Sequence, residues 1–264
     1  MSGDKIVGTE GPAKARNNEA NNWGFETDSQ VGLVAGRMYG ANVATVREVV
    51  ASYDIGADRL RRTLAATRSE ADRSAAILIF ALAEDLMISG LRQHLPGNVK
   101  GGWEEIASGN GLLATASDRI SLLALLGWIH PEVYADLRVL KTIRNRFAHH
   151  PDVIGFSDSK IRSSIATLAP HEKHPIEVIT GVAHKSLTPR QLYMLRSGGL
   201  IIRLVANLAV APTARQLNVA PGHIDMVPWS ELPPNLQELM QISAEHLVAI
   251  VQKSSDTGLS QSLS

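Results

Sequence analysis

The sequence predicts an all-α protein, and three observations lead to that prediction. Apolar residues recur at spacings of three and four, the period of an amphipathic helix, in most segments after residue 42. Prolines, glycines and capping residues stand where those segments begin and end. Strand patterns are scarce, because only Ile176–Thr180 gathers β-branched residues and no similar segment lies nearby to pair with it. One short strand would not change the class, so we expect a helical bundle.

The first part of the chain divides into an arm and a long helix. Residues 1–41 are rich in Gly, Asn and Ala and show no sustained period, which predicts a flexible N-terminal arm. From Asn42 the pattern becomes helical, with a weak point at Gly56. Ser69–Asp72 resembles a capping box, so a long helix is expected to begin there and to stop at Pro96–Gly97.

Further helices are expected toward the C-terminus. A Gly-rich connection contains a predicted helical turn near Trp103–Ile106, and Ser157 is expected to cap a short piece reaching Leu168. Proline at the first helical position favours the starts at residues 131, 189 and 234. The longer predicted helices are 117–128, 131–149, one that opens at Thr188 and Pro189, and an amphipathic one after Pro233 and Pro234. We therefore expect a bundle over 42–210, a C-terminal extension over 211–253 and a disordered Ser-rich tail over 254–264.

The composition excludes several kinds of protein. Lys and Arg together number 26, as do Asp and Glu, so no overall field draws the chain to nucleic acid or to an anionic membrane. The absence of cysteine excludes disulfides, thiolate catalysis and cysteine metal sites. We find no signal-peptide pattern, and apolar runs such as Ala75–Ala83 are judged too short to span a bilayer. The expectation is a soluble, cytoplasmic protein without a membrane partner.

The most informative segment is Lys141–His150, which closes a predicted helix with an arginine, an asparagine and a histidine. Pro131 is placed to begin this helix, and Pro151 disfavours the α conformation at His150. The helix is therefore expected to end at His149, where the carbonyls of the last turn favour an imidazolium. A histidine there can accept and donate protons near neutral pH. With Arg144 and Asn145 it forms a set that can work on phosphate.

An ordered set of motifs resembles the mannitol operon repressor family. In chain order these motifs are Ser69–Arg73, Glu84–Asp85, Ala114–Ile120, Asp136–Arg138, Ile143–His149 and Phe156–Asp158. The resemblance covers about residues 60–210. Four residues separate Arg144 from His149, and this spacing also resembles the HEPN superfamily of helical domains, many of which are metal-independent RNases.

The resemblance implies a homodimer in which two antiparallel copies of the 131–149 helix place two sets of Arg144, Asn145 and His149 in one cleft. In an ideal helix Arg144 and His149 lie about 140° apart, whereas Asn145 and His149 share a face. The helix must therefore fray near its end, or a partner must complete the site.

In such a cleft, His149 would move protons at an RNA 2′-hydroxyl or leaving oxygen, Arg144 would stabilise charge on the phosphate, and Asn145 would orient either group. The implied function is an endoribonuclease in a regulatory, toxin or defence setting. RNA would be the substrate, no metal or cofactor would be needed, and an antitoxin or regulator protein is a further expected partner.

Structural roles for the same residues stay open at this point. Arg144 could pair across the bundle with Asp72, Glu84 or Asp85, and His149 could cap the carbonyls of its own helix end. The chain would then be a non-enzymatic regulatory module that resembles the mannitol operon repressor family and binds a protein partner in place of DNA.

Supporting residues are expected around this set. Asp72 falls in the first turn of its helix, where an acid complements the helix dipole. At least one of Glu84 and Asp85 is expected to face inward or toward a partner, because their helix is otherwise apolar, and a solvated face stays open as the alternative. Arg146 could join a phosphate-binding groove or remain a solvated side chain. His150 is expected to be an exposed neighbour that could assist His149.

Three further patterns carry weaker expectations. Basic residues form two clusters that could line a phosphate-binding groove or be solvated helix faces: Arg59, Arg61, Arg62 and Arg68, and Lys141, Arg144 and Arg146. The run His171–His174 lacks the spacing of a zinc-protease helix. Thr213–Ile224 reads superficially like a helix-turn-helix, but its prolines leave the second helix too short to fill a major groove. We expect neither a metal site nor direct DNA binding.

Overall fold

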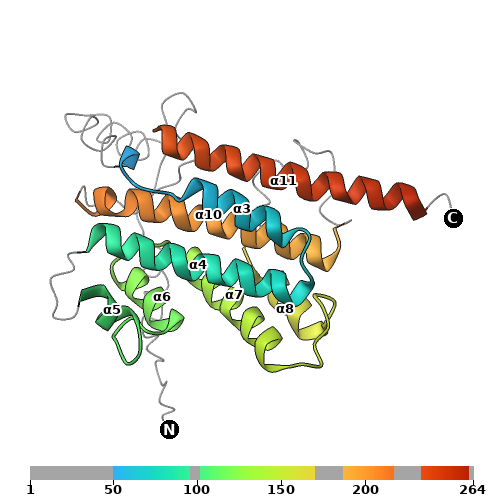
Figure 1. The fold of residues 1–264 in the computed structure, drawn as a ribbon, viewed down its shortest axis with the longest axis horizontal. Helices are drawn as coiled ribbons and strands as arrows, with labels where there is room; N and C mark the ends of the chain where they lie inside the picture. The colour runs from blue at the N-terminus through green and yellow to red at the C-terminus, as the bar shows by residue number, and fades with distance from the viewer. Residues whose placement is uncertain (1–49, 96–101, 170–186, 217–232, 262–264) are drawn as a thin grey trace, which may run out of the picture. The chain divides into compact units, whose positions relative to one another are not determined.

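The computed structural model describes residues 50–95, 102–169, 187–216 and 233–261. Within these ranges the chain forms eight helices and no strand, which confirms the predicted all-α class (Figure 1). The helices are α3 (Ala57–Thr67), α4 (Asp72–His94), α5 (Gly102–Ala107), α6 (Ala116–Leu125), α7 (Pro131–His149), α8 (Ser159–Thr167), α10 (Pro189–Gln216) and α11 (Pro234–Gln261).

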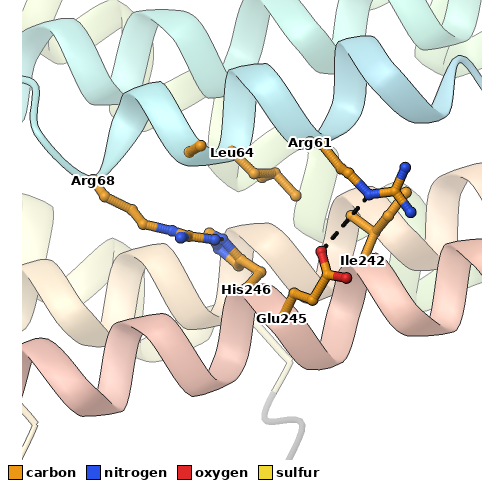
Figure 2. Close-up of a pocket in the computed structure, with 7 residues that line it drawn as sticks. Arg61, Leu64, Arg68, Ile242, Glu245 and His246 are labelled. Atoms are coloured by element: carbon orange, nitrogen blue, oxygen red, sulfur yellow. Dashed lines mark hydrogen bonds and ion pairs between the residues drawn. The ribbon is translucent and has the colours of Figure 1, made fainter.

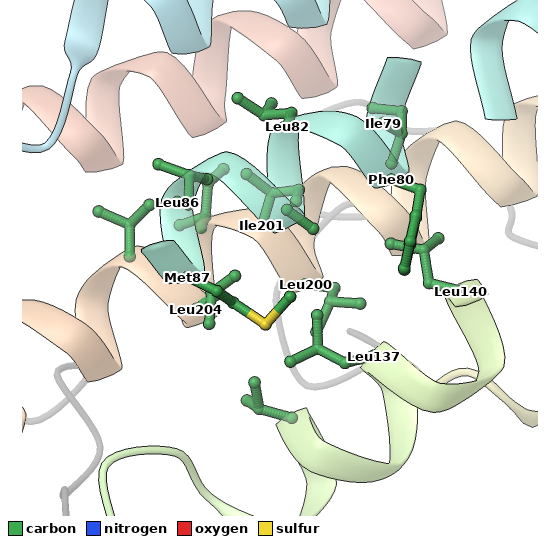
Figure 3. Close-up of a cluster of buried hydrophobic side chains, with 14 of the residues drawn as sticks. Ile79, Phe80, Leu82, Leu86, Met87, Leu137, Leu140, Leu200, Ile201 and Leu204 are labelled. Carbon is green, nitrogen blue, oxygen red and sulfur yellow. The ribbon is translucent and has the colours of Figure 1, made fainter. Parts of the chain in front are cut away.

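Helix α4 is the centre of the packing, because it contacts α3, α6, α7 and α10. Apolar residues surround most of its circumference, as expected for a helix that is buried on several sides. Figure 3 shows Met87 of α4 in one buried cluster with Leu137 of α7 and Leu204 of α10. Gly90 lets α10 come close, since a Cβ there would lie 2.9 Å from a methyl carbon of Leu208.

The boundaries of α7 agree with the sequence prediction. His130 is the N-cap, and its Nδ1 accepts a hydrogen bond from the backbone N–H of Glu132 at 3.4 Å. Pro131 is the first helical residue. The helix continues to His149, and His150 leaves the α region with φ −119° and ψ 93°. The position of His149 in the last helical turn is therefore fixed by local sequence signals.

The predicted cap of α4 is wrong. The helix begins at Asp72 behind an N-cap at Ala71, which makes no side-chain capping hydrogen bond. The hydroxyl of Ser69 donates instead to the carbonyl of Ala66, at 3.0 Å, and so belongs to the end of α3. The predicted stop is confirmed, because Leu95, directly before Pro96, is extended.

The predicted cap of α8 is displaced by one residue. Asp158, and not Ser157, is the N-cap, and its Oδ1 accepts from the backbone N–H groups of Lys160 and Ile161 at 3.1 and 3.0 Å. The prediction of a disordered tail over 254–264 is wrong as far as residue 261, because α11 continues to Gln261.

Two helices bear on the question of a membrane. Helix α4 and the Pro189–Ala211 part of α10 are long and apolar enough to cross a bilayer, by length and composition alone. The judgement that every apolar run is too short is thus wrong for these two helices. More than half of the most apolar stretch of each is buried inside the bundle, which is equally typical of core helices in soluble proteins. They are weak evidence for a membrane.

Several predictions fall outside the described residues. These are the arm over 1–41, the candidate strand Ile176–Thr180, the run His171–His174 and most of the helix-turn-helix-like segment. The first residues of that last segment, Thr213–Gln216, continue α10.

A buried histidine joins α11 to the bundle. Helix α11 packs against α3 and α10, and His246 on α11 is 1% exposed. Its Nε2 lies 3.3 Å from the carbonyl oxygen of Met194, and its Nδ1 lies 3.4 Å from Nη2 of Arg68. A guanidinium can only donate, so Nδ1 must accept and Nε2–H must donate to Met194. Burial, with the charge of Arg68, lowers the pKa of His246 to about 4.

We predict that the free energy of unfolding falls as the pH falls from about 6.5 to about 4. Across this range His246 is protonated in the unfolded chain but stays neutral in the folded chain. The free energy of unfolding therefore falls by up to about 1.4 kcal/mol for each pH unit of acidification. Urea unfolding of the full chain at several pH values measures this slope. A His246→Gln variant, which keeps a side-chain N–H but does not titrate, should show a flatter slope. An equal slope in both proteins would contradict the assignment.

Candidate functional site

The C-terminal half of α7 is held by an aromatic cluster. Phe147 is fully buried and meets Phe156 edge to face, with 5.3 Å between ring centroids. Phe156 in turn stacks on Tyr193 of α10 at 4.3 Å. With Ile143 also buried, this face of α7 is fixed against the core. The polar residues between these anchors are thereby held at defined positions on the helix.

Arg144 is half-buried at the junction of α7 and α4. Its Nη1 donates to Oδ1 of Asn145 at 2.9 Å, and its Cζ lies 5.8 Å from the ring centroid of Phe80. An aromatic ring attracts a guanidinium only weakly and carries no net charge, so it does not neutralise the positive charge. Among the described residues no carboxylate forms an ion pair with Arg144.

The three carboxylates considered as partners of Arg144 pair with other arginines. Glu84 lies 3.3 Å from Arg119, and Asp85 lies 3.5 Å from Arg59. Asp72 pairs with Arg190. The structural alternative for Arg144, a pairing with one of these three acids, is therefore not found among the described residues.

His149 and His150 are both exposed, as expected for His150. The ring of His149 makes no hydrogen bond with a described residue, so the capping role considered for it is not seen. The carbonyls beyond the helix end are held instead by Arg73, whose Nη2 donates to the oxygens of His150, Pro151 and Val153 at 3.1–3.2 Å. In the sequence Arg73 stands only as part of a motif, and no local pattern indicates this role.

One chain does not bring Arg144 and His149 together. Helix α7 stays regular through His149, and the N–H of His150 still bonds to the carbonyl of Arg146. The fraying that could turn His149 toward Arg144 is therefore absent. Residues at spacings of three and four share a helix face, so Asn145 and His149 lie on the same exposed side of α7. A site that contains both Arg144 and His149 would therefore need a second molecule.

Arg146 has a structural role. Its Nε and Nη2 donate to the two carboxylate oxygens of Asp158 at 2.8 and 3.0 Å, a two-pronged arrangement. The hydrogen bond to Arg146 is the main reason why the pKa of Asp158 is lowered to about 2. Since Asp158 also caps α8, this pair ties the end of α7 to the start of α8. Because both nitrogens bind Asp158, a role of Arg146 in lining a phosphate-binding groove does not fit the structure.

The two basic clusters lie on helices whose packing partners differ, except that both helices contact α4. Helix α3, which carries the first cluster, packs against α4 and α11, whereas α7, which carries the second, packs on α4, α6, α8 and α10. Lys141 contacts the hydroxyl of Ser117 on α6. No group of three or more His, Asp or Glu side chains within the described ranges is arranged to hold a metal ion.

Asp72 ties three segments together. Its Oδ2 accepts from the backbone N–H of Phe156 at 2.8 Å, and its Oδ1 pairs with Arg190 of α10. Arg190 also donates to the carbonyls of Thr67 and Glu70, between α3 and α4. Asp72 does lie in the first turn of α4, as expected, but its partners show that it mainly holds the segment that follows α7.

Gly155 is the close-approach point of this junction, and it provides a test. A Cβ there would lie 2.7 Å from Oδ2 of Asp72, which is already held in place. We predict that Gly155→Ala lowers the free energy of unfolding by about 1–3 kcal/mol, the usual cost of overpacking. In an Asp72→Ala background the same substitution should cost much less, because the clashing oxygen is gone. Urea unfolding of the four proteins measures the coupling, and equal costs in both backgrounds would contradict the account.

Comparison of the chain with models of known protein families finds no match, and comparisons with curated proteins and with solved structures find none either. The described residues form an all-α bundle. The end of α7 carries an exposed histidine, a half-buried asparagine and an arginine that has no carboxylate partner among the described residues.

Proposed function

We propose that this protein is a metal-independent endoribonuclease of the HEPN type, active as a homodimer through α7. The observation that carries the proposal is the state of Arg144. Within the described part of the chain its guanidinium meets Asn145 and the ring of Phe80, while Asp72, Glu84 and Asp85, the acids considered as its partners, each pair with another arginine. A positive charge held in place without a paired acid is suited to a phosphate oxygen.

The chemistry follows from the three side chains. His149 would remove the proton of an RNA 2′-hydroxyl, whose oxygen then attacks the adjacent phosphorus, or would protonate the departing 5′ oxygen. Arg144 would stabilise the charge that grows on the phosphate, and Asn145 would orient Arg144 through the hydrogen bond between them. The products are a 2′,3′-cyclic phosphate and a 5′-hydroxyl. DNA lacks the nucleophile and should survive.

A second copy of the chain would complete the site. An antiparallel α7 from a partner could place its His149 beside the Arg144 of the first protomer, which one regular helix does not do. The exposed face that carries Asn145 and His149 is the surface on which the two helices would meet. We place this dimer in the cytoplasm, in a regulatory, toxin or defence setting.

We predict that the purified protein cleaves RNA in the presence of EDTA and leaves DNA of the same sequence intact. His149→Ala should reduce the rate by about 10²–10⁴, the usual contribution of an acid–base group, and Arg144→Ala by about 10²–10³. Gel assays with a single-stranded RNA and its DNA counterpart, followed by end-group analysis, measure both effects. Arg162→Ala, which removes an exposed arginine from α8, is the matched control and should keep full activity.

A folded dimer that cleaves no RNA would contradict the proposal, as would cleavage that stops when EDTA is added. Normal activity in Arg144→Ala would show that another group carries the phosphate charge.

A mixing experiment tests whether the site is shared between protomers. When inactive Arg144→Ala and His149→Ala proteins are exchanged into mixed dimers, one of the two composite sites regains an intact Arg144 and an intact His149. We predict that activity returns on mixing, up to about half of the wild-type activity in each mixed dimer, because one site of two is restored. Mixed dimers that form, as shown by native mass spectrometry, but stay inactive would contradict a shared site.

One observation favours a second function. Ile154, a few residues beyond His149 along the chain, is 92% exposed, and a large exposed apolar side chain could contribute to contact with another protein. The alternative is a non-enzymatic regulatory module, similar to the mannitol operon repressor family, that binds a protein partner in place of DNA. Partner binding that is lost in Ile154→Asp, together with the absence of any RNA cleavage by the wild-type chain, would support it.

A further inference from the structure

Three basic residues form an inclined row on α7. Arg138, Lys141 and Arg144 follow one another at a spacing of three, so they lie along one ridge of the helix, with about 4.5 Å of rise between neighbours. The row begins at the exposed Arg138 and ends at Arg144, which is half-buried against Phe80 of α4. It therefore leads from the solvent face of α7 to the arginine proposed above to bind the phosphate.

The row has no acid partner in the part of the chain that the structure describes. Between residues 137 and 149 the helix contains no aspartate or glutamate. Its two earlier acids, Glu132 and Asp136, pair with Arg203 of α10. Lys141 contacts a serine hydroxyl of α6, which is neutral. Three positive charges along about 9 Å of helix are thus without a paired negative charge among the described residues.

The basic residues of α3 are in a different state. Arg61 contacts Glu238 and Glu245 of α11 at 2.9 and 3.7 Å, and Arg59 lies 3.5 Å from Asp85 of α4. Figure 2 shows Arg61 and Glu245 joined across the space between α3 and α11. Acids therefore offset part of the charge on α3, whereas none does so along the row on α7 within the described ranges.

Tyr134 supports the exposed end of the row. Its ring packs partly against the hydrophobic core, which holds the ring in place. The Cζ of Arg138 lies 5.7 Å from the ring centroid, and Nη1 of Arg138 donates to the Tyr134 hydroxyl at 3.3 Å. The guanidinium is thereby positioned in advance, while its exposure leaves it accessible. Nucleobases stack on guanidinium planes and on aromatic rings, so this end of the row can hold an unpaired base.

We propose that Arg138, Lys141 and Arg144 form a track for the single-stranded RNA that flanks the cleaved bond, an inference that rests on the endoribonuclease function proposed above. Arg138 and Lys141 bind phosphates of the flank, and Tyr134 with Arg138 stacks one base. A single strand is required, because the bases of a duplex are already stacked on one another. The flank is selected by being unpaired and little by its sequence, since phosphate contacts carry no sequence information and every base has a face that stacks.

The proposed dimer leaves this track open to RNA. In that dimer Arg144 lies beside the partner's His149, which is the last residue of the partner's α7. Because the two helices are antiparallel, the partner's α7 extends from that point away from Arg138. It therefore does not cover the earlier part of α7, and an RNA strand held at the shared site can continue along the track.

Fluorescence anisotropy of a labelled single-stranded RNA with methylated 2′-hydroxyls measures binding to the full chain without cleavage. We expect the logarithm of the binding constant to fall with the logarithm of the salt concentration at a slope of about −2, as three phosphate contacts predict for a single strand. Arg138→Gln and Lys141→Gln should each make the slope shallower by about 0.7, because each removes one contact. Tyr134→Leu should weaken binding about tenfold and leave the slope unchanged, since stacking releases no counterions.

Arg162→Gln is the matched control, because Arg162 is an exposed arginine of α8 outside the row, and it should leave affinity and slope unchanged. Thermal melting shows whether each variant is folded. Absence of saturable binding to the wild type would overturn the track, and so would equal slopes in the wild type and Arg138→Gln.

The same proteins separate this inference from the nuclease itself. Binding with the expected slopes, but without cleavage of unmethylated RNA, would support the track and contradict the proposed function. Cleavage of unmethylated RNA, with slopes that the substitutions leave unchanged, would support the proposed function and overturn the track.

Discussion

The burial of α4 against α7 and α10 determines how the other described helices are arranged. Helix α4 contributes buried side chains on several sides, and α7 and α10 both contact it. This packing fixes which face of α7 is turned inward through Leu140, Ile143 and Phe147. Because a helix is rigid over these few turns, fixing that face also fixes the direction in which the polar residues between the anchors point. The candidate site is thus a consequence of the core.

Arginines placed at helix junctions hold the segments around this core. Arg190 joins α10 to the link between α3 and α4, Arg73 holds the chain that leaves α7, and Arg196 donates to the carbonyls of Ile165 and Ala166 at the end of α8. Each of these guanidinium groups donates to backbone carbonyls at or just beyond the end of a helix. Arg144 differs from them, since its described contacts are a neighbouring amide and an aromatic ring. That difference is the physical basis for the proposal that Arg144 binds a phosphate oxygen.

The helical class and the limits of α7 could be predicted because they rest on local signals. Pro131 and Pro151 act within one turn of their own positions, and the apolar spacing of three and four reports directly which face is buried. The start of α4 could not be predicted in the same way. Ser69 has the chemistry of a cap, but its hydroxyl bonds back to Ala66, and two such local hydrogen bonds compete on nearly equal terms.

The partners of the candidate residues could not be predicted from the sequence. The sequence does not show which arginine pairs with Asp72. The observed partner, Arg190, is 118 positions away along the chain. Such competition is decided by three-dimensional packing and leaves no local pattern. His246 is a similar case, because nothing near it in the sequence marks a histidine that α10 and α3 enclose. For Arg146 the partner lies nearby in the sequence, because Asp158 belongs to the motif Phe156–Asp158 that follows Ile143–His149.

The central claim is that the end of α7 meets a phosphodiester, and NMR spectroscopy of the histidine rings tests it most directly. The full chain is titrated with a single-stranded RNA whose 2′-hydroxyls are methylated, so that it binds without being cut. The account predicts a saturable shift of the His149 ring signals that disappears in Arg144→Ala, while the signals of the buried His246 remain in place. Saturation with this RNA that leaves the His149 signals unchanged would contradict the account.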